Sequence, residues 1–308
     1  MKKLTLKSFA KLNLFLEVLN IRQDNYHNIK TLFERIDLCD KIILKSRRDK
    51  KIKIICKSAD VPADSSNLAY KSAKLLQDSF RIDKGVEITI IKRIPVGSGL
   101  GGGSSNAASV ILGLNKLWRL NLKQNELAKL ARNIGADVCF FIYNCPFAWG
   151  QERGDKIRLL KALKGLRLWH ILVVPKIKVS TRFIYKKWDR LRQTLTPPFL
   201  EVKRNVVGRA GLTPPKYDVK ILTLAIKKHN LTLLGETLFN SLEQVTTKLY
   251  AEVEYIKQKL INLGLKSILM SGSGPAVFGI VTSRKEAVSL CRQLKENRLV
   301  QVFVTRTI

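Results

Sequence analysis

The sequence predicts an α+β protein built from two domains. The chain has 308 residues, of which 45% are hydrophobic, and this is enough for two cores of ordinary size. Strand patterns lead through the first part of the chain into a glycine-rich loop that an amphipathic helix follows. Residues 233–308 read as helix, strand, strand, helix and strand, which is most of a ferredoxin-like domain.

The first 20 residues predict a strand. Leu12, Leu14 and Leu16 fall on one face by strict alternation. The same alternation places Lys11 and Asn13 together on the opposite face. A lysine and an amide side by side on one strand face are candidate polar groups for a site.

Alternating and helical patterns continue toward the loop. The segments 40–46 (DKIILKS) and 50–58 (KKIKIICKS) predict a hairpin, and residues 65–80 predict a helix from apolar positions at helical spacing. Residues 85–94 (GVEITIIKRI) predict a strand that runs directly into the glycines.

Residues 95–110, PVGSGLGGGSSNAASV, hold five glycines and four serines just ahead of a predicted helix at 107–118. Unpaired backbone amides at a helix N-terminus bind phosphate, and small residues let the phosphate reach the main chain. A Walker A loop would need a lysine, and this loop has none. Gly97, Gly99 and Gly102 match the dinucleotide fingerprint, but the chain context is not that of a Rossmann unit. Protein-kinase motifs downstream are absent.

The middle of the chain predicts a second helix and a domain boundary. Residues 125–135 (NELAKLARNIG) read as a helix that ends with Gly135 at C′. The sequence pattern changes near residue 160, so we expect domains at 1–160 and 161–308. A strand at 166–175 follows, and the sequence TPP occurs at 196–198 and again at 213–215.

The C-terminal segment has the clearest pattern. A helix is expected from about 233 to 263, followed by strands at 266–273 and 276–281. Ser283 and Glu286 predict a capping box for the helix at 285–294. The segment 299–308 (LVQVFVTRTI) predicts the last strand.

Composition narrows the class of protein. No apolar run approaches the roughly 18 residues of a membrane helix, and lysines interrupt the N-terminal apolar stretch, so we expect a soluble cytoplasmic protein. The five cysteines form no C-x-x-C pair and only three histidines are present, which favours reduced, mostly buried thiols over a zinc site.

The formal net charge of +32 suggests two kinds of partner. Nucleic acid is one, but the basic residues are spread along the chain, and aromatic residues make up only 7% of it. A positive field also attracts small phosphorylated substrates. The sequence therefore favours the second kind and leaves the oligomeric state open.

The glycine-rich segment resembles a known ATP-binding motif. The stretch P-x-G-x-G-L-G-G-G-S-S-N-A-A at 95–108 resembles that of the GHMP kinases, the superfamily of galactokinase, homoserine kinase, mevalonate kinase and phosphomevalonate kinase. KSFAKLNLFLEV at 7–18 and SGSGPAVFG at 271–279 are similar to its two other signatures. The resemblance implies a two-domain fold with a ribosomal protein S5 domain 2-like N-terminal domain and a ferredoxin-like C-terminal domain.

A second segment points to the acceptor. RQDNYHNIKTLFERIDLCD at 22–40 is similar to the R-x-D-G-Y-H segment of the kinases of 4-diphosphocytidyl-2-C-methyl-D-erythritol, and NIGADVCFF at 133–141 resembles their G-A-D-V-P-F-F. Asn25 stands where that family has glycine, and asparagine is well able to replace glycine at positive φ. Cys139 replaces proline. The resemblance implies transfer of the γ-phosphate of ATP to the 2-hydroxyl of this cytidyl alcohol.

The resemblance also implies the roles of individual residues. Asp137 corresponds to the catalytic aspartate and Lys11 to its lysine partner; without the resemblance, Asp137 reads equally well as a helix N-cap. ATP is assigned to the loop and two flanking positions: Pro95, Val96, Gly97, Ser98, Gly99, Leu100, Gly101, Gly102, Gly103, Ser104 and Ser105, with Asn67 and Lys92 near the adenine. The acceptor is assigned to Asn13, Tyr26, His27, Tyr185, Gly272, Ser273 and Gly274.

Several alternatives stay open at this stage. Tyr185 can be a core aromatic, and residues 272–274 can form a purely structural turn. Phosphoryl transfer calls for Mg²⁺, but no carboxylate cluster marks its ligands, and Ser105 is the candidate. Two rival functions remain. The chain could be another GHMP kinase that acts on homoserine or mevalonate, or a non-catalytic protein that binds a nucleotide or nucleic acid.

Overall fold

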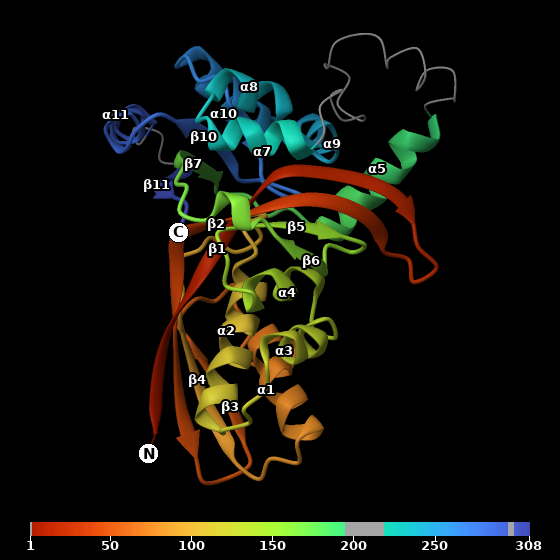
Figure 1. Cartoon of the computed structure of the whole chain (residues 1–308), viewed down its shortest axis with the longest axis vertical. Coiled ribbons are helices and arrows are strands. Elements are labelled where there is room, and N and C mark those ends of the chain that lie inside the picture. Colours follow the sequence, from red (N-terminus) through yellow and green to blue (C-terminus); the bar gives the residue numbers. More distant parts are fainter. Residues whose placement is uncertain (1, 195–218, 295–298) are drawn as a thin grey trace.

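The computed structural model describes residues 2–194, 219–294 and 299–308, which form two β-sheets with helices packed on them (Figure 1). Both TPP segments lie outside the described residues. The helices α1 to α4 lie in the lower half of Figure 1 beside β3 and β4, and helices α7 to α11 gather in the upper half. The predicted α+β architecture is confirmed, and the boundary near residue 160 stays a prediction.

The first sheet has seven strands, with the order β3-β4-β2-β1-β8 and with β5 and β6 attached beside β2. Its strands are β1 (Lys3–Ile21), β2 (His27–Arg47), β3 (Ile52–Cys56), β4 (Gly85–Ile91), β5 (Phe147–Gln151), β6 (Lys156–Leu159) and β8 (Phe239–Asn240). Its helices are α1 (Leu68–Ser79), α2 (Gly102–Leu117), α3 (Gln124–Ala131) and α4 (Ala136–Ile142).

The second sheet has four antiparallel strands in the order β11-β7-β10-β9. Taken in chain order this is the 4-1-3-2 arrangement of a ferredoxin-like domain, as predicted. Its elements are β7 (Trp169–Pro175), α5 (Thr181–Thr194), α7 (Val219–Lys227), α8 (Leu231–Thr237), α9 (Glu243–Leu249), α10 (Ala251–Asn262), β9 (Ile268–Met270), β10 (Val277–Val281), α11 (Arg284–Leu294) and β11 (Val300–Arg306). A short 3₁₀ turn spans Lys161–Leu163.

The predicted hairpin of 40–46 with 50–58 is wrong. Strand β4 lies between the two segments, antiparallel to β2 and parallel to β3. Ile88 and Ile90 of β4 are buried, whereas Lys53 of β3 is exposed. The strand with the more apolar side chains therefore takes the inner position, and the strand with a lysine takes the edge.

The predicted continuous helix from 233 to 263 is also wrong. The chain leaves α8 after Thr237, and Phe239 and Asn240 pair in parallel with β1 before α9 begins. The buried Asn240 amide donates to the carbonyls of Met270 and Gly272. These tertiary hydrogen bonds hold Asn240 in extended backbone although the apolar spacing is helical.

Two caps differ from the prediction. Gly135 is not the C′ residue of α3, which ends four residues earlier; it is the N-cap of α4 in extended backbone. Asp137 therefore lies in the first turn of α4 and is not its N-cap. At α11, Ser283 Oγ accepts from the Glu286 amide, but the Glu286 carboxylate accepts from Thr282 instead of completing the box.

Three apolar cores hold these layers together. One packs α1 to α4 against the first sheet, one packs α10 and α11 against the second sheet, and one lies between the sheets. The third contains Leu12 and Phe15 of β1 together with Leu172 and Phe278 of the second sheet. The two halves of the chain therefore share buried surface beside the glycine-rich loop.

Composition-based expectations have mixed outcomes. No helix in the described ranges is long and apolar enough to cross a membrane. All five cysteines are free, as expected. Only Cys139 and Cys291 are buried, so the prediction that most of the thiols are buried is wrong. Burial raises the pKa of the Cys139 thiol to about 12.

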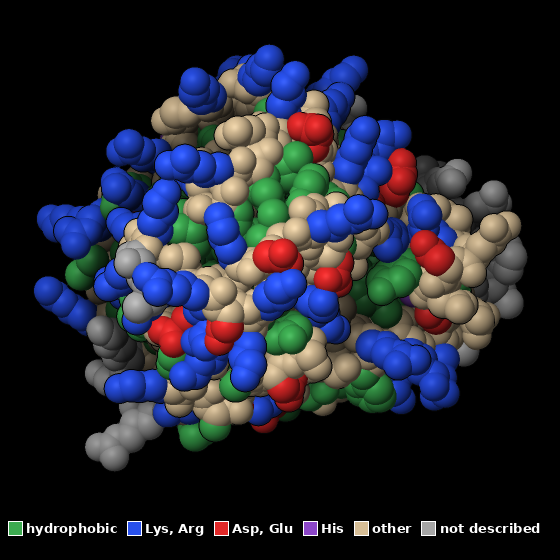
Figure 2. All heavy atoms as spheres, turned by 90° about the horizontal axis from the view of Figure 1, so that it is seen from below, with side chains coloured by type: hydrophobic (Ala, Val, Ile, Leu, Met, Phe, Trp, Pro, Cys, Tyr) green, Lys and Arg blue, Asp and Glu red, His purple; other side chains and the backbone are tan. Residues whose placement is uncertain are grey.

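Lys and Arg side chains are spread over the whole face shown in Figure 2, without gathering in one stripe.

Candidate active site

The glycine-rich loop connects β4 to α2, as the sequence predicted. Gly101 is the N-cap of α2 in the left-handed conformation, with φ 68°, and no side chain caps the helix. The first residues of α2, Gly102, Gly103 and Ser104, line a cavity. An uncapped N-terminus that faces a cavity offers N–H donors and positive potential to an anion.

Two glycines are required by close contacts. A Cβ on Gly99 would lie 2.1 Å from the carbonyl oxygen of Ser271, and its φ of 78° also disfavours a side chain. A Cβ on Gly101 would lie 3.1 Å from Lys11 Cγ at φ 68°. The loop could not approach β1 and the turn after β9 so closely with larger residues.

Hydrogen bonds to two other segments fix the loop. The carbonyl of Leu100 accepts from the Lys11 amide at 3.0 Å. The carbonyl of Ser98 accepts from the Ala276 amide, and that of Gly99 accepts from Ser271 Oγ, both at 3.2 Å. The loop is thus bonded both to β1 and to the turn between β9 and β10.

A buried ion pair anchors the entrance to the loop. Asp40 is fully buried and accepts from Lys92 Nζ at 2.6 Å, from the Arg93 amide at 2.7 Å and from the Ile94 amide at 2.8 Å. Burial lowers the pKa of Lys92, and the Asp40 carboxylate opposes that shift. Lys92 also donates to the Ile94 carbonyl, so the lysine predicted near the adenine has a structural role as well.

Lys11 and Asp137 lie together beside the loop. Lys11 Nζ is 3.6 Å from Asp137 Oδ2 and donates to Asn13 Oδ1; the side chain of Lys11 is 5% exposed and that of Asp137 33%. Burial lowers the pKa of Lys11 below its ordinary value, and the charge of Asp137 opposes this. Asn13 donates in turn to Thr31, so its amide is oriented with its oxygen toward the ammonium. A half-exposed carboxylate next to a buried cation can accept a proton from a bound hydroxyl.

One cavity of about 1050 Å³ brings the predicted residues together. It is lined by Lys11 and Asp137, by the loop from Pro95 to Ser104, by Asn67 and Lys92, and by Asn13, Tyr26, His27, Tyr185, Gly272 and Ser273. Ser105 and Gly274 do not line it, and Ser105 is buried with its Oγ accepting from Ser8. A smaller cavity of about 500 Å³ beside α11 and β11 holds none of the predicted residues.

Aromatic and basic side chains form another part of the cavity lining. Tyr26 is 58% exposed, and the Arg153 guanidinium lies 5.4 Å from the centre of its ring. The His27 and Tyr185 rings are 4.9 Å apart. Burial raises the pKa of the Tyr185 hydroxyl, and nearby Asp137 adds to the shift. Asn25 has φ 59°, as predicted for the asparagine that replaces glycine.

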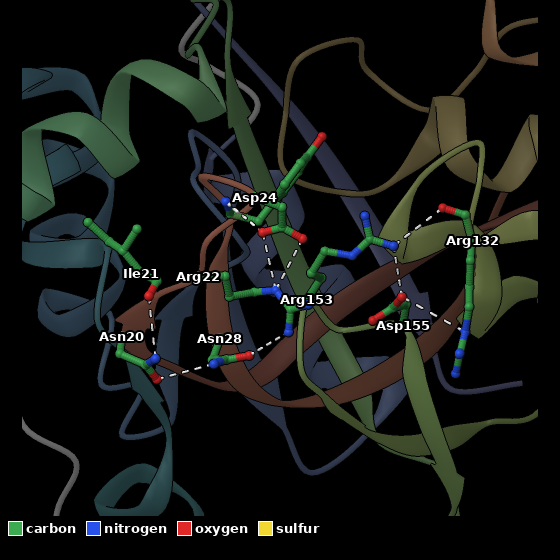
Figure 3. A network of polar contacts seen from close by, with 9 residues as sticks. Asn20, Ile21, Arg22, Asp24, Asn28, Arg132, Arg153 and Asp155 are labelled. Atoms are coloured by element: carbon green, nitrogen blue, oxygen red, sulfur yellow. Dashed lines mark hydrogen bonds and ion pairs between the residues drawn. The ribbon is translucent and has the colours of Figure 1, made fainter.

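A polar network holds the turn that carries Tyr26 (Figure 3). Arg22 Nε donates to Asp24 at 3.2 Å, and Asp24 accepts from the Tyr26 amide at 3.1 Å. Arg153 donates to the buried Asp155 at 3.0 Å, which keeps the guanidinium over the tyrosine ring. The turn before β2 and the turn after β5 are in this way fixed relative to one another.

Arg153, Arg182 and Asp189 are among the charged cavity residues that sequence reasoning missed. Arg153 follows β5 in a turn, and the other two belong to α5, far along the chain from the predicted signatures. None belongs to a motif with its own spacing. Only the packing of α5 against the start of β2 brings Asp189 to His27, at 2.7 Å.

Comparisons with known proteins agree with this geometry. The model of the GHMP kinases N terminal domain matches residues 67–145, and that of the GHMP kinases C terminal domain matches 222–298. A relative from Acetivibrio thermocellus named 4-diphosphocytidyl-2-C-methyl-D-erythritol kinase is 36% identical over 308 residues, covering all of both chains. One of the same name from Geobacillus sp. (strain WCH70) is 42% identical over 91% of this chain and 88% of its own.

Solved structures support the same fold. A crystal structure of 4-(cytidine 5'-diphospho)-2C-methyl-D-erythritol kinase covers 99% of this chain and 100% of its own, with a TM-score of 0.77 and 28% identity. A mevalonate kinase structure matches 99% of both chains with a TM-score of 0.70 at 17% identity, which bears on the fold alone.

Proposed function

The chain belongs to the GHMP kinase family, among the 4-diphosphocytidyl-2-C-methyl-D-erythritol kinases, and we propose that it transfers the γ-phosphate of ATP to the 2-hydroxyl of that cytidyl alcohol. The product is an intermediate on the non-mevalonate route to isoprenoid precursors. The observation that carries the proposal is the placement of the Lys11–Asp137 pair in the same cavity as the uncapped N-terminus of α2. The five free thiols are consistent with the reducing cytoplasm.

The nucleotide is assigned to the loop side of the cavity. Gly102, Gly103 and Ser104 line it at the first turn of α2, where the unpaired helix amides and the helix dipole would favour the phosphates. Asn67 has its side chain engaged in capping α1, so it would offer the adenine a fixed surface and not a free amide. Ser105, which is buried against Ser8, is left out of this assignment.

The acceptor is assigned to the opposite side. Its hydroxyl would bind at Asp137, which accepts the proton as the phosphoryl group arrives. The Lys11 ammonium lies beside Asp137 and stabilises negative charge on the transferring group, and Asn13 holds the ammonium in place. The cytosine would bind between Tyr26, His27 and Tyr185.

The donor set of the cavity fits Mg²⁺ that arrives with the nucleotide. No cluster of three acidic, histidine or cysteine side chains in the described ranges could hold a metal ion by itself. Mg²⁺ commonly keeps several waters and binds substrate phosphates, with few protein oxygens. Here Ser104, which carries a hydroxyl oxygen, lines the cavity in the first turn of α2. When bound, the ion would neutralise the β- and γ-phosphate oxygens.

The function is tested by ADP release from purified protein with ATP and the cytidyl alcohol, against homoserine and mevalonate at equal concentration. We expect turnover with the cytidyl alcohol alone. Equal or faster turnover with homoserine or mevalonate would contradict the assignment. ATP hydrolysis that no acceptor stimulates would also contradict it.

Tyr26→Ala is expected to raise KM for the cytidyl alcohol about tenfold and to leave KM for ATP nearly unchanged, because one aromatic face for the base is lost. Steady-state kinetics with each substrate varied in turn measure this. Tyr26→Phe keeps the ring and is the matched control. Equal increases in both KM values would contradict stacking at Tyr26.

The kcat of the wild-type chain is expected to fall at alkaline pH, with an apparent pKa below 10.5, the ordinary value of lysine. Burial lowers the pKa of Lys11, and the reaction needs its charged form, so the rate falls as the pH rises through the lowered pKa. A rate profile from pH 6 to 11 measures the limb. The Lys11→Arg variant stays charged, so its kcat should not fall over this alkaline range. If its kcat falls as in the wild type, another group causes the decrease.

A further inference from the structure

A carboxylate contacts the histidine at the base end of the cavity. His27 Nε2 lies 2.7 Å from Asp189 Oδ1, with 8% of the histidine side chain and 23% of the aspartate side chain exposed. His27 begins β2 and Asp189 lies on α5, so the contact joins the two halves of the chain. Neither the glycine loop nor the Lys11–Asp137 pair needs this contact.

Three residues of α5 fix the imidazole. Tyr185, Trp188 and Asp189 occupy positions i, i+3 and i+4, which lie on one face of a helix. The Tyr185 ring is tilted over His27 at 4.9 Å, and the Trp188 ring meets it edge-on at 5.8 Å. Trp188 is 2% exposed, so this face of α5 is packed. The imidazole therefore has one orientation, with Nε2 toward the carboxylate.

The contact selects a tautomer. An ionised carboxylate only accepts hydrogen bonds, so Nε2 must carry the proton that joins it to Asp189. In a neutral imidazole the other nitrogen is then an acceptor. Across the described ranges Nδ1 of His27 has no hydrogen-bond partner, and His27 lines the cavity. The ring thus offers a lone pair to a ligand.

Resting on the function proposed above, we infer that Asp189 is a positioning residue that makes the site select cytosine over uracil by holding His27 as an acceptor at Nδ1. Cytosine carries an amino group at C4 that donates to such an acceptor. Uracil carries a carbonyl oxygen there, which would face the lone pair without a hydrogen. A polar site rejects a base that leaves its buried group unpaired.

Asp189→Asn is the direct test. The amide of asparagine can donate to Nε2, which moves the histidine proton to Nδ1 and suits uracil instead of cytosine. The same exchange at the aspartate of the serine-protease triad gives the wrong histidine tautomer with the geometry intact. In ADP-release assays we expect the wild type to prefer the cytidyl alcohol over its uridyl analogue about a hundredfold. In Asp189→Asn that ratio of kcat/KM should fall at least tenfold.

Two variants distinguish this positioning role from a general loss of structure. Asp189→Glu keeps a carboxylate and should restore most of the preference. Asp83→Asn makes the same charge change at a side chain that is 78% exposed and paired with Lys50, and it should leave the ratio unchanged. If the two kcat/KM values fall in parallel in Asp189→Asn, the residue is merely structural and the inference is wrong. A wild type that uses both bases equally well overturns it too.

A spectroscopic measurement on the unmodified protein is independent of variant folding. The chain has three histidines, so the nitrogen spectrum of its imidazoles can be assigned. We expect His27 to carry its proton on Nε2 at neutral pH; a proton on Nδ1 overturns the inference. Lack of turnover with any cytidyl alcohol would instead refute the proposed function, while leaving the tautomer measurement valid.

Discussion

Asp137→Asn is expected to lower kcat for the cytidyl alcohol by about two to four orders of magnitude. The carboxylate is the proton acceptor nearest Lys11, at 3.6 Å, and an amide of the same size cannot take the proton of a hydroxyl. KM for ATP should change little, because the loop amides and not Asp137 bind the phosphates in the proposed arrangement. Single-turnover and steady-state assays of ADP release measure both constants.

A surface exchange provides the control for this prediction. Asp78→Asn makes the same change at a side chain that is 60% exposed and paired with Lys74, and it should retain full activity. If Asp137→Asn keeps kcat within a few-fold of the wild type, Asp137 is not the base. The lysine would then act alone on the transferring phosphoryl group.

Asp40→Asn is expected to destabilise the protein by about 3–5 kcal/mol, since it removes one partner of a buried ion pair. The new amide would point a donor at Lys92 Nζ, now 2.6 Å from the carboxylate, and leave that ammonium uncompensated in a side chain that is 11% exposed. Urea unfolding monitored by tryptophan fluorescence measures the loss. Because Asp40 also binds the Arg93 and Ile94 amides, KM for ATP should rise as the loop entrance loosens.

Two comparisons test this interpretation. Asp49→Asn breaks the exposed pair with Arg47 and should lower the stability far less than Asp40→Asn does. Combining Asp40→Asn with Lys92→Met removes both charges and should recover part of the stability lost by the single change. A single variant as stable as Asp49→Asn would show that the buried pair contributes little.

The parts of the fold that could be predicted are those with a local signal. Alternation identified β1 and placed Lys11 beside Asn13, and the glycines before an apolar-periodic stretch identified α2 and its N-terminus. The order of the C-terminal elements, each read from its own local pattern, indicated a ferredoxin-like domain. Each of these signals lies within about 20 residues of chain, which is the range over which period and capping act.

What could not be predicted depends on contacts between distant segments. Strand β4 lies between β2 and β3, with Ile88 and Ile90 buried on one of its faces, and local patterns do not reveal this strand order. Asn240 breaks the expected long helix through hydrogen bonds to the turn after β9. Asp189 reaches His27 from 162 positions along the chain. The glycine-rich loop and the cavity residues Tyr26, His27 and Tyr185 were therefore predicted from sequence, whereas the contact of Asp189 with His27 needed coordinates.

The hydrogen bonds from Ser98 and Gly99 to the turn between β9 and β10 bear on how ligands enter. They cross the seam between the two sheets, where Gly99 also packs against the Ser271 carbonyl. Separating the two sheets would break these hydrogen bonds and expose the apolar core that lies between the sheets. We therefore expect ATP and ADP to exchange through the mouth of the cavity while the two sheets stay in contact.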